Sequence, residues 1–483
     1  MKTRVTDLML YRWRYVISYS IIIAAISSVI AIASLYVPGG LRQAEIDTAL
    51  QSGSLSTQSI DPRTVINLPY HILQRLCFMM FGVTTVSIKL PSIILGVLTS
   101  IGIFLLIRTW FRRNIAILTT ILATTTAHFL FLVQDGTPAI LFSFLAIWIL
   151  FAATYVTRKK LFGTFWKALT GVLMATALYV PLGIYLVLAI LTTAFFHPHI
   201  RHVLTRFARP RLIIAVILGF VAITPLVYAS IIDYHVALRL LGLADSPINL
   251  LANIKQVAHD LFGFLSPPDD YLLQPIYSLG LVLLILVGCY KLVTYKHTAR
   301  SYITLLLAGT TIPIIILNPI HIHNLFPLAV LMVALGVATL ITDWYKLFPR
   351  NPYARVVGLF PLGLLIGGIV LSGVLRYMNN YEYNPEVLRN YSSDLRLLSN
   401  QLDYERADRQ TTRFVVTKAE LPFYNLVAHY DKRFAASTDA TTPPKVLIMS
   451  HAAYHTTKQS NEPSLIVTNR RANDADRLYI YRQ

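Results

Sequence analysis

The sequence carries little charge, since only 13% of its 483 residues are Asp, Glu, Lys or Arg while 55% are hydrophobic. So little polar surface cannot coat a soluble globule of this size, which excludes a soluble fold. Cysteine is also scarce: Cys77 and Cys289 lie in or beside different hydrophobic segments, give no metal-ligand spacing and predict neither a disulfide nor redox chemistry. The sequence has no internal repeat, no low-complexity tract, no P-loop and no GxGxxG motif.

What the sequence has instead is long apolar runs. A basic N-terminal segment leads into the first of them, which at about 23 residues is longer than the core of a signal peptide and is interpreted as a retained signal anchor. The sequence therefore predicts a polytopic α-helical membrane protein with about eleven transmembrane helices, the fifth and sixth short. The predicted spans are residues 15–37, 87–107, 114–132, 138–156, 164–180, 183–196, 212–231, 275–290, 301–318, 325–341 and 356–376.

The connectors between these runs alternate in charge. Lys and Arg crowd the N-terminus and every second connector, whereas the remaining connectors carry the acids. Because short cytoplasmic loops retain positive charge, we expect the N-terminus and the basic connectors in the cytoplasm, and the acidic connectors and the C-terminus outside. This topology accounts for the net charge of +19. Nucleic-acid binding, which would need a basic patch interleaved with base-stacking aromatic residues, is not predicted.

The polar segments predict two domains. Residues 1–376 form the transmembrane domain, with long outer loops at 38–86 and 232–274. The second loop has helical spacing of its apolar residues, which suits one or two helices lying in the membrane interface. From residue 377 to 483 the composition is polar, with helical stretches and four short strand-like runs, and predicts a small extracytoplasmic α/β domain.

The first outer loop places Glu45 and Asp47 shortly after the first span. Further along come "SGSL" at Ser52–Leu55, "NLPYHIL", "FGV", "KLPS" at Lys89–Ser92 and a hairpin tip with "DGTPA" at Asp135–Ala139. This arrangement resembles the GT-C class of integral-membrane glycosyltransferases, specifically the family of protein O-mannosyltransferases and lipid A aminoarabinose transferases. "HIHNLFPLAVLMVAL" is similar to the family segment in which a polar outer loop precedes a late helix that contains proline.

The sequence departs from the family pattern at three positions. The leading Asp of the acidic motif is Ala44, the Lys before the helix that follows is Asn67, and the Asp after "TP" is Ala139, which leaves Asp135 as the nearest acid. These departures are compatible with a different donor or with a degenerate enzyme.

The resemblance implies that a sugar passes from a polyprenyl-phosphate carrier to a hydroxyl or similar nucleophile on the outer face. A carboxylate in an outer loop would accept the proton of the acceptor as general base. Glu45 is the first choice and Asp47 the second. Asp135 is a further catalytic candidate because an acid at membrane depth is costly, although at the very tip of a hairpin it could equally be hydrated.

The departing phosphate needs cations or hydrogen-bond donors. Arg63 and His71 of the first loop, and His321, His323 and Asn324 before the tenth span, are the substrate-binding candidates. Arg63 could instead extend to lipid headgroups, and His71 could simply cap a helix. The two alternating histidines have no third ligand nearby, so no metal is predicted, and no cofactor besides the lipid-linked donor. Ser266–Tyr271 could form a lid over the site, but a turn before the eighth span is the simpler expectation.

Two other functions fit a protein of this kind. A transporter of a lipid-linked sugar would be expected to show repeats and helices broken near the midplane, and the sequence indicates neither. A non-catalytic membrane assembly protein stays open because of the departures at Ala44 and Asn67. The predicted partners are the lipid-linked donor, membrane lipids and an acceptor that is a glycan, a lipid or a protein. No motif encodes the identity of the sugar or of the acceptor.

Overall fold

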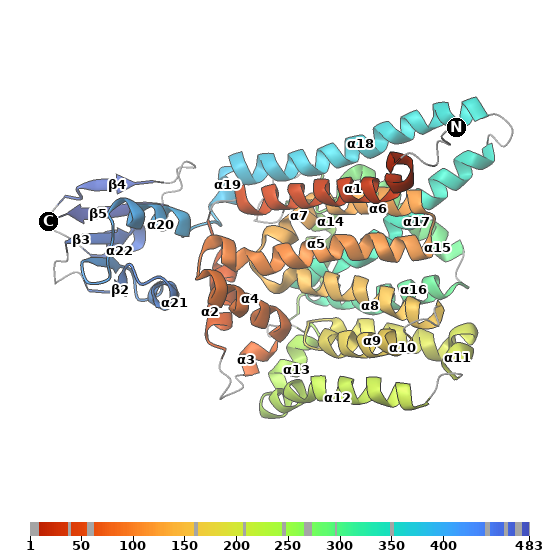
Figure 1. Ribbon diagram of the computed structural model, residues 1–483, viewed down its shortest axis with the longest axis horizontal. Coiled ribbons are helices and arrows are strands. Elements are labelled where there is room, and N and C mark those ends of the chain that lie inside the picture. Colours follow the sequence, from red (N-terminus) through yellow and green to blue (C-terminus); the bar gives the residue numbers. More distant parts are fainter. Residues whose placement is uncertain are drawn as a thin grey trace.

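The computed structural model describes residues 9–36, 40–55, 62–158, 163–205, 209–243, 248–264, 273–294, 297–347, 352–439, 445–457, 462–468 and 476–482. Helices dominate it, and a five-stranded sheet lies near the C-terminus (Figure 1).

Every predicted span corresponds to helix. The long helices lie side by side, roughly along the long axis of the molecule (Figure 1). They are α1 (Met9–Tyr36), α5 (Thr85–Trp110), α6 (Arg113–Thr124), α8 (Leu141–Arg158), α9 (Gly163–Ala177), α10 (Gly183–Phe196), α12 (Arg209–Ile232), α15 (Leu279–Thr294), α16 (Ala299–Leu317), α17 (Phe326–Leu347) and α18 (Pro352–Tyr383). The short helix α7 (Ala127–Gln134) follows α6 after a bend.

The number of spans is smaller by strict criteria. Among the described residues, five helices are long and apolar enough to cross a membrane, or up to eight if each bent helix pair counts as one span. The count of eleven is therefore not confirmed. One reason is length, since α9 has 15 residues and α15 has 16, fewer than the about 20 that a bilayer core requires. Another is that the third predicted span is broken into α6 and α7, which meet at 64°.

The two ends of the helix bundle differ in charge. One end, here called the basic end, carries Arg112, Arg158, Arg201, Arg300 and Lys346 at or near helix termini, together with α11 (Pro198–Thr205) (Figure 1). The opposite end, here called the loop end, carries α2 (Gln43–Gly53), α3 (Pro62–Val65), α4 (Leu68–Phe81) and α13 (Tyr234–Leu240). The cations gathered at the basic end agree with the basic set of connectors in the sequence. Which end faces the cytoplasm stays a prediction.

The long loops are helical. The first contains α2, α3 and α4, and the second, where one or two helices are expected, contains α13 and α14 (Leu250–Phe262). Short 3-10 helices form the hairpin tip, η2 (Pro138–Ile140), and the segment before α17, η3 (Pro319–Leu325). The helix α4 begins with a proline in its first turn, where the missing N–H costs nothing. Ser266–Tyr271 lies outside the described residues.

The polar C-terminal segment contains the sheet. Its strands are β1 (Thr412–Val415), β2 (Ala435–Ser437), β3 (Val446–Ser450), β4 (Leu465–Val467) and β5 (Leu478–Arg482), in the order β2-β1-β3-β5-β4. The strands β2, β1 and β3 are parallel, and β5 is antiparallel to both of its neighbours. The helices are α19 (Pro385–Leu388), α20 (Leu395–Tyr404), α21 (Leu421–Tyr430) and α22 (His451–Thr456). The helix α18 continues to Tyr383, beyond the expected domain boundary at 376, and the division into domains stays a prediction.

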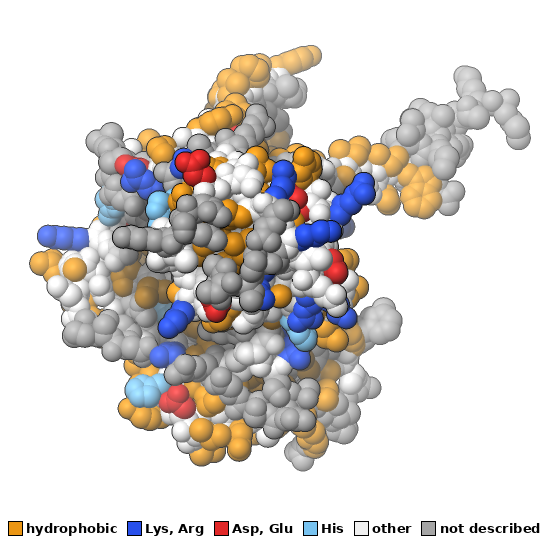
Figure 2. All heavy atoms as spheres, turned by 90° about the vertical axis from the view of Figure 1, so that its left-hand side faces the viewer, with side chains coloured by type: hydrophobic (Ala, Val, Ile, Leu, Met, Phe, Trp, Pro, Cys, Tyr) orange, Lys and Arg blue, Asp and Glu red, His pale blue; other side chains and the backbone are white. Residues whose placement is uncertain are grey.

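The C-terminal segment packs on the first loop. One buried apolar cluster joins Ile46 of α2 and Phe78 of α4 to Phe423 and Val427 of α21. The backbones of Leu41 and Ser392 also exchange hydrogen bonds of 2.6 and 2.9 Å. The C-terminal segment therefore holds the beginning of α2 in place. Seen from the side on which the C-terminal segment lies, charged side chains of both signs are spread over the face of the molecule (Figure 2).

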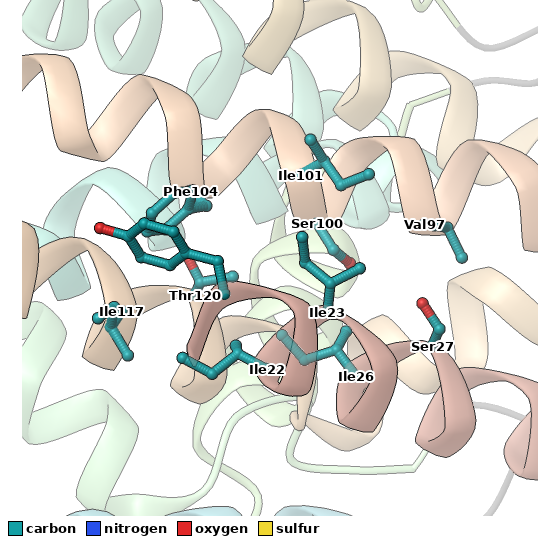
Figure 3. A pocket seen from close by; sticks show the side chains of 11 residues that line it. Ile22, Ile23, Ile26, Ser27, Val97, Ser100, Ile101, Phe104, Ile117 and Thr120 are labelled. Atoms are coloured by element: carbon teal, nitrogen blue, oxygen red, sulfur yellow. The ribbon is translucent and has the colours of Figure 1, made fainter. Parts of the chain in front are cut away.

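A small apolar pocket of about 40 Å³ lies between α1, α5 and α6 (Figure 3). Isoleucines and Phe104 line it, with Ser27, Ser100 and Thr120 as its few polar side chains. None of its described lining residues is charged, so it offers no group for chemistry on a sugar or a phosphate.

Candidate active site

Glu45 lies fully buried at the start of α2. One of its carboxylate oxygens, Oε2, accepts a hydrogen bond of 2.7 Å from the backbone N–H of Arg42. The other, Oε1, accepts one of 2.6 Å from the backbone N–H of Gly136, at the tip of the hairpin between α7 and α8. An acid in the first turn of a helix is favoured by the free N–H groups and the dipole there. The same carboxylate also fastens α2 to the hairpin.

Asp135 and Arg42 form a buried ion pair beside Glu45. Nη2 of Arg42 lies 2.6 Å from Oδ1 of Asp135, and Oδ2 accepts a hydrogen bond of 2.6 Å from the hydroxyl of Thr137. The guanidinium of Arg42 also lies over the ring of Phe131, 5.2 Å from its centroid. Asp135 is 1% exposed. Although it lies near the tip of a hairpin, its side chain is therefore not in contact with bulk water.

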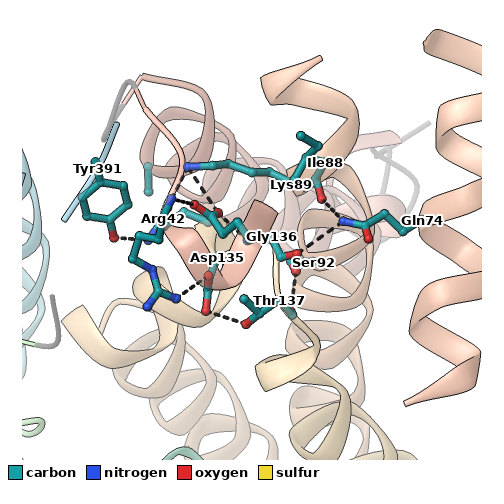
Figure 4. Close-up of polar contacts among 12 residues, drawn as sticks. Arg42, Gln74, Ile88, Lys89, Ser92, Asp135, Gly136, Thr137 and Tyr391 are labelled. Atoms are coloured by element: carbon teal, nitrogen blue, oxygen red, sulfur yellow. Dashed lines mark hydrogen bonds and ion pairs between the residues drawn. The ribbon is translucent and has the colours of Figure 1, made fainter. Parts of the chain in front are cut away.

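Lys89 completes the group. Its ammonium lies 3.7 Å from Oε1 of Glu45 and donates a hydrogen bond of 3.0 Å to the side-chain oxygen of Gln134. Gln134 in turn donates one of 3.1 Å to the hydroxyl of Tyr391, in the segment between α19 and α20. Arg42, Glu45, Lys89 and Asp135 are here called the buried charge cluster. They bring together α2, α5, the hairpin and the C-terminal segment (Figure 4).

The electrostatics of the cluster are balanced, with two cations facing two carboxylates. Burial raises the pKa of Glu45 above its ordinary value, and the charge of Asp135 raises it further, against the opposing charges of Lys89 and Arg42. A carboxylate with a raised pKa is a stronger base than an exposed one. The cluster can therefore take up a proton or neutralise a new anion.

His71 belongs to a second polar network, which touches the same hairpin. Its Nδ1 lies 2.8 Å from the hydroxyl of Ser52, which donates a hydrogen bond of 2.6 Å to Gln74. Gln74 then donates to the backbone oxygens of Ile88 (2.9 Å) and Gly136 (3.3 Å). Burial lowers the pKa of His71 to about 4. The imidazole is thus neutral near pH 7, and its contact with Ser52 links α2 to α4.

The other predicted site residues lie in different places. Asp47 is exposed and accepts a hydrogen bond of 2.9 Å from Gln43, away from the buried charge cluster. The side chain of Arg63 lies outside what the structure describes. His321, His323 and Asn324 lie on η3.

Among these three, His323 comes nearest to the cluster. Its ring stacks on Phe131, with 5.6 Å between centroids, and Phe131 is the ring that Arg42 covers. Asn324 donates a hydrogen bond of 3.5 Å to the backbone oxygen of Pro181. Within the described residues, no three His, Cys, Asp or Glu side chains are grouped so that they could hold a metal ion.

Sequence reasoning did not single out four residues of this site, namely Arg42, Lys89, Gln134 and Tyr391. For Lys89 a signal was available, because an ammonium inside an otherwise apolar helix is costly and marks a candidate functional group. It also lies in the "KLPS" match. Tyr391 gave no signal, since it comes from a segment more than 250 residues away from its partner Gln134.

Comparisons with known proteins agree with this architecture. Residues 69–228 match the model of a family described as dolichyl-phosphate-mannose-protein mannosyltransferase. Comparison with curated proteins gives no match.

Two solved structures share the fold. ArnT from Cupriavidus metallidurans, solved bound to undecaprenyl phosphate, is 14% identical with a TM-score of 0.51, over 97% of this chain and 98% of that one. The Archaeoglobus fulgidus oligosaccharyltransferase, solved with a tethered acceptor peptide, is 12% identical with a TM-score of 0.51. That match covers 88% of this chain and 64% of the oligosaccharyltransferase, so the chain spans less than two thirds of its length. The chain therefore shares the fold of these two proteins, and its expected resemblance to the mannosyltransferase and aminoarabinose transferase family of the GT-C class is confirmed.

Proposed function

We propose that the protein is a glycosyltransferase that moves a sugar from a polyprenyl-phosphate carrier to an acceptor on the outer face of the membrane. The observation that carries the proposal is the buried charge cluster at the loop end of the bundle. Support also comes from ArnT, which shares the fold and was solved with undecaprenyl phosphate, and from the family description, which names a polyprenyl-phosphate sugar.

Glu45 serves as the general base in this proposal. The acceptor oxygen attacks the anomeric carbon of the sugar, and the bond from that carbon to the phosphate oxygen breaks. The electron pair leaves with the polyprenyl phosphate, and the acceptor proton passes to the carboxylate of Glu45. A carboxylate offers about four lone-pair sites, and the backbone donors of Arg42 and Gly136 occupy two of them.

Asp135 is the second carboxylate of the proposal, with a positioning role. Both of its oxygens already have partners, in Arg42 and Thr137. It therefore holds the guanidinium beside Glu45 until the donor arrives. Asp47, which lies on the exposed face of α2, takes no part in this scheme.

Arg42 and Lys89 are the cations that we assign to the departing phosphate. A charged donor on a phosphate oxygen forms a hydrogen bond roughly twice as strong as a neutral one. Arg42 would exchange Asp135 for a phosphate oxygen, and Lys89 would turn from Glu45 as that carboxylate takes up the proton. His323, at the edge of the cluster, and the neutral His71 would act as hydrogen-bonding groups.

The test of the proposal uses a strain without the gene. We expect its lipid extract to accumulate a polyprenyl-phospho-sugar and its envelope to lack one glycan. The wild-type gene and Asp47→Asn should clear the accumulated lipid, whereas Glu45→Gln should not, at equal levels of folded protein. A strain without any accumulated lipid, or a Glu45→Gln variant that clears it, would be evidence for a transporter or an assembly protein.

A further inference from the structure

A larger pocket, of about 250 Å³, opens at the basic end of the bundle. It lies where the end of α5 meets α15, α16 and α17, at the opposite end of the helices from the buried charge cluster. This space is many times the roughly 10–15 Å³ that a single water needs. That is enough for a phosphate group and the atoms attached to it.

The charge of this pocket is of one sign. Its lining includes Lys291, Arg300 and Lys346, and none of its described lining residues is an acid. Lys346 forms an exposed ion pair of 3.3 Å with Asp343. Lys291 and Arg300 are only partly exposed, so their positive charges repel each other and are less hydrated than in open water. An anion in the pocket would relieve both costs.

Arg300 is held in position. Its guanidinium donates a hydrogen bond of 2.6 Å to the backbone oxygen of Trp110 and lies 4.8 Å over the ring of Phe111. A guanidinium has five N–H donors in a planar fork, more than this bond uses. The N-terminus of α16, a helix of 19 residues, lies beside it at Ala299. The helix dipole makes this end of the helix positive. Both features favour a phosphate oxygen.

The pocket also has an apolar part. Leu292, Leu331 and Leu335 line it, together with the hydroxyl side chains of several Ser and Thr residues. Cations, hydroxyl groups and leucines between transmembrane helices suit the headgroup of an anionic lipid, with its chains along the helices. The sequence expectation that this end faces the cytoplasm would place it in the inner leaflet.

We propose that this pocket is a binding site for a phosphate-bearing anion, supplied either by the headgroup of an anionic phospholipid or by free phosphate. The site is separate from the buried charge cluster and does not depend on the proposed transfer reaction.

The test uses the full-length protein in nanodiscs. Wild-type Tm is measured in pure phosphatidylcholine, in phosphatidylcholine with increasing phosphatidylglycerol, and in phosphatidylcholine with added inorganic phosphate. We expect phosphatidylglycerol to raise the Tm. The phosphatidylglycerol fraction that gives half of the rise in Tm should be about fivefold higher in Arg300→Gln and in Lys346→Gln, since each variant lacks one cation. Because Lys346 is exposed, Lys346→Gln should fold even if Arg300, which is bonded to Trp110, is needed for packing.

Arg201→Gln is the matched control, because Arg201 is an exposed cation of α11 at the same end and does not line the pocket. Its lipid response should equal that of the wild type. A response to inorganic phosphate that is lost in the same two variants would support the site with free phosphate as the source. An absence of response to both anions, or an equal loss in Arg201→Gln, would overturn the proposal.

Discussion

Glu45 and Asp47 show how much depends on the position of a single residue. Both follow the first apolar run, and the sequence offers both as bases. The structure buries Glu45 and exposes Asp47, because residues two apart on an α-helix point to different sides. The polar stretch after the first span predicts a loop, whereas residues 43–53 form the helix α2. With the period of a helix, Glu45 shares a face with Ala49 and Ser52, which are also buried.

The raised pKa of Glu45 leads to a prediction at this scale. A general base works only when ionised, so the rate of transfer should fall as the pH is lowered through the pKa of Glu45. Because burial raises that pKa, the fall should begin above the about 4.3 of an ordinary glutamate. The pH profile of kcat/KM, measured in membranes, checks this.

Asp47→Asn is the control for the pH profile, since it removes an exposed carboxylate of the same helix. Its profile should match that of the wild type. An acid limb that moves with Asp47→Asn, or a rate that stays constant down to the pKa of an exposed glutamate, would argue against Glu45 as the base.

At the scale of elements, the apolar runs predicted the long helices well, because length and hydropathy alone decide them. The break between α6 and α7 was not predicted. It lies in a threonine-rich stretch, where Thr125 and Thr126 donate hydrogen bonds to backbone oxygens of the preceding turn. The hydroxyl of Thr126 also caps α7. Such side chains compete with the helical pattern, and their effect depends on the neighbours that the fold supplies. The short elements β2 and α22 gave too few residues for any period.

The contact of the hairpin tip with α2 and α5 gives a prediction for these elements. A Cβ on Gly136 would lie 2.8 Å from Cγ2 of Ile88 and 3.1 Å from Oε1 of Glu45. Gly136→Ala should therefore lower the stability of the protein by about 1–3 kcal/mol and impair transfer by displacing Glu45. The Tm in detergent and the transfer rate are the measurements.

Gly309→Ala is the matched control, because a Cβ on this glycine of α16 meets no atom within 4 Å. Gly309→Ala should keep the transfer rate of the wild type and keep or raise its Tm, since alanine is the better helix former. A Gly136→Ala variant as stable and as active as Gly309→Ala would show that the packing of the hairpin against Glu45 is not tight.

At the scale of the whole molecule, the site is assembled from distant segments. Residues 42–45, 89, 134–135 and 391 meet only because the helices pack as they do and the C-terminal segment folds back on α2. The sequence predicted the membrane class, the sorting of charge and the α/β character of the C-terminal segment. It could not predict that Tyr391 would reach Gln134, since the pairing depends on the docking of that segment.

Removal of residues 384–483 tests this dependence. It would expose the apolar side chains of Leu41, Ile46 and Phe78, which the C-terminal segment covers. We expect a lower Tm and little transfer. Tyr391→Phe keeps the aromatic ring but removes the hydrogen bond with Gln134, and should cost about 0.5–1.5 kcal/mol. If the shortened protein kept the Tm and rate of the full chain, the C-terminal segment would have no part in shaping the site.

The central claim is that the buried charge cluster receives the phosphate of a lipid-linked sugar. A structure of the full-length protein in nanodiscs with polyprenyl phosphate tests it most directly. The account predicts a phosphate oxygen about 2.7–2.9 Å from the guanidinium of Arg42 or the ammonium of Lys89, with Glu45 beside it. A phosphate bound elsewhere, with the four charges still paired only with each other, would contradict the claim.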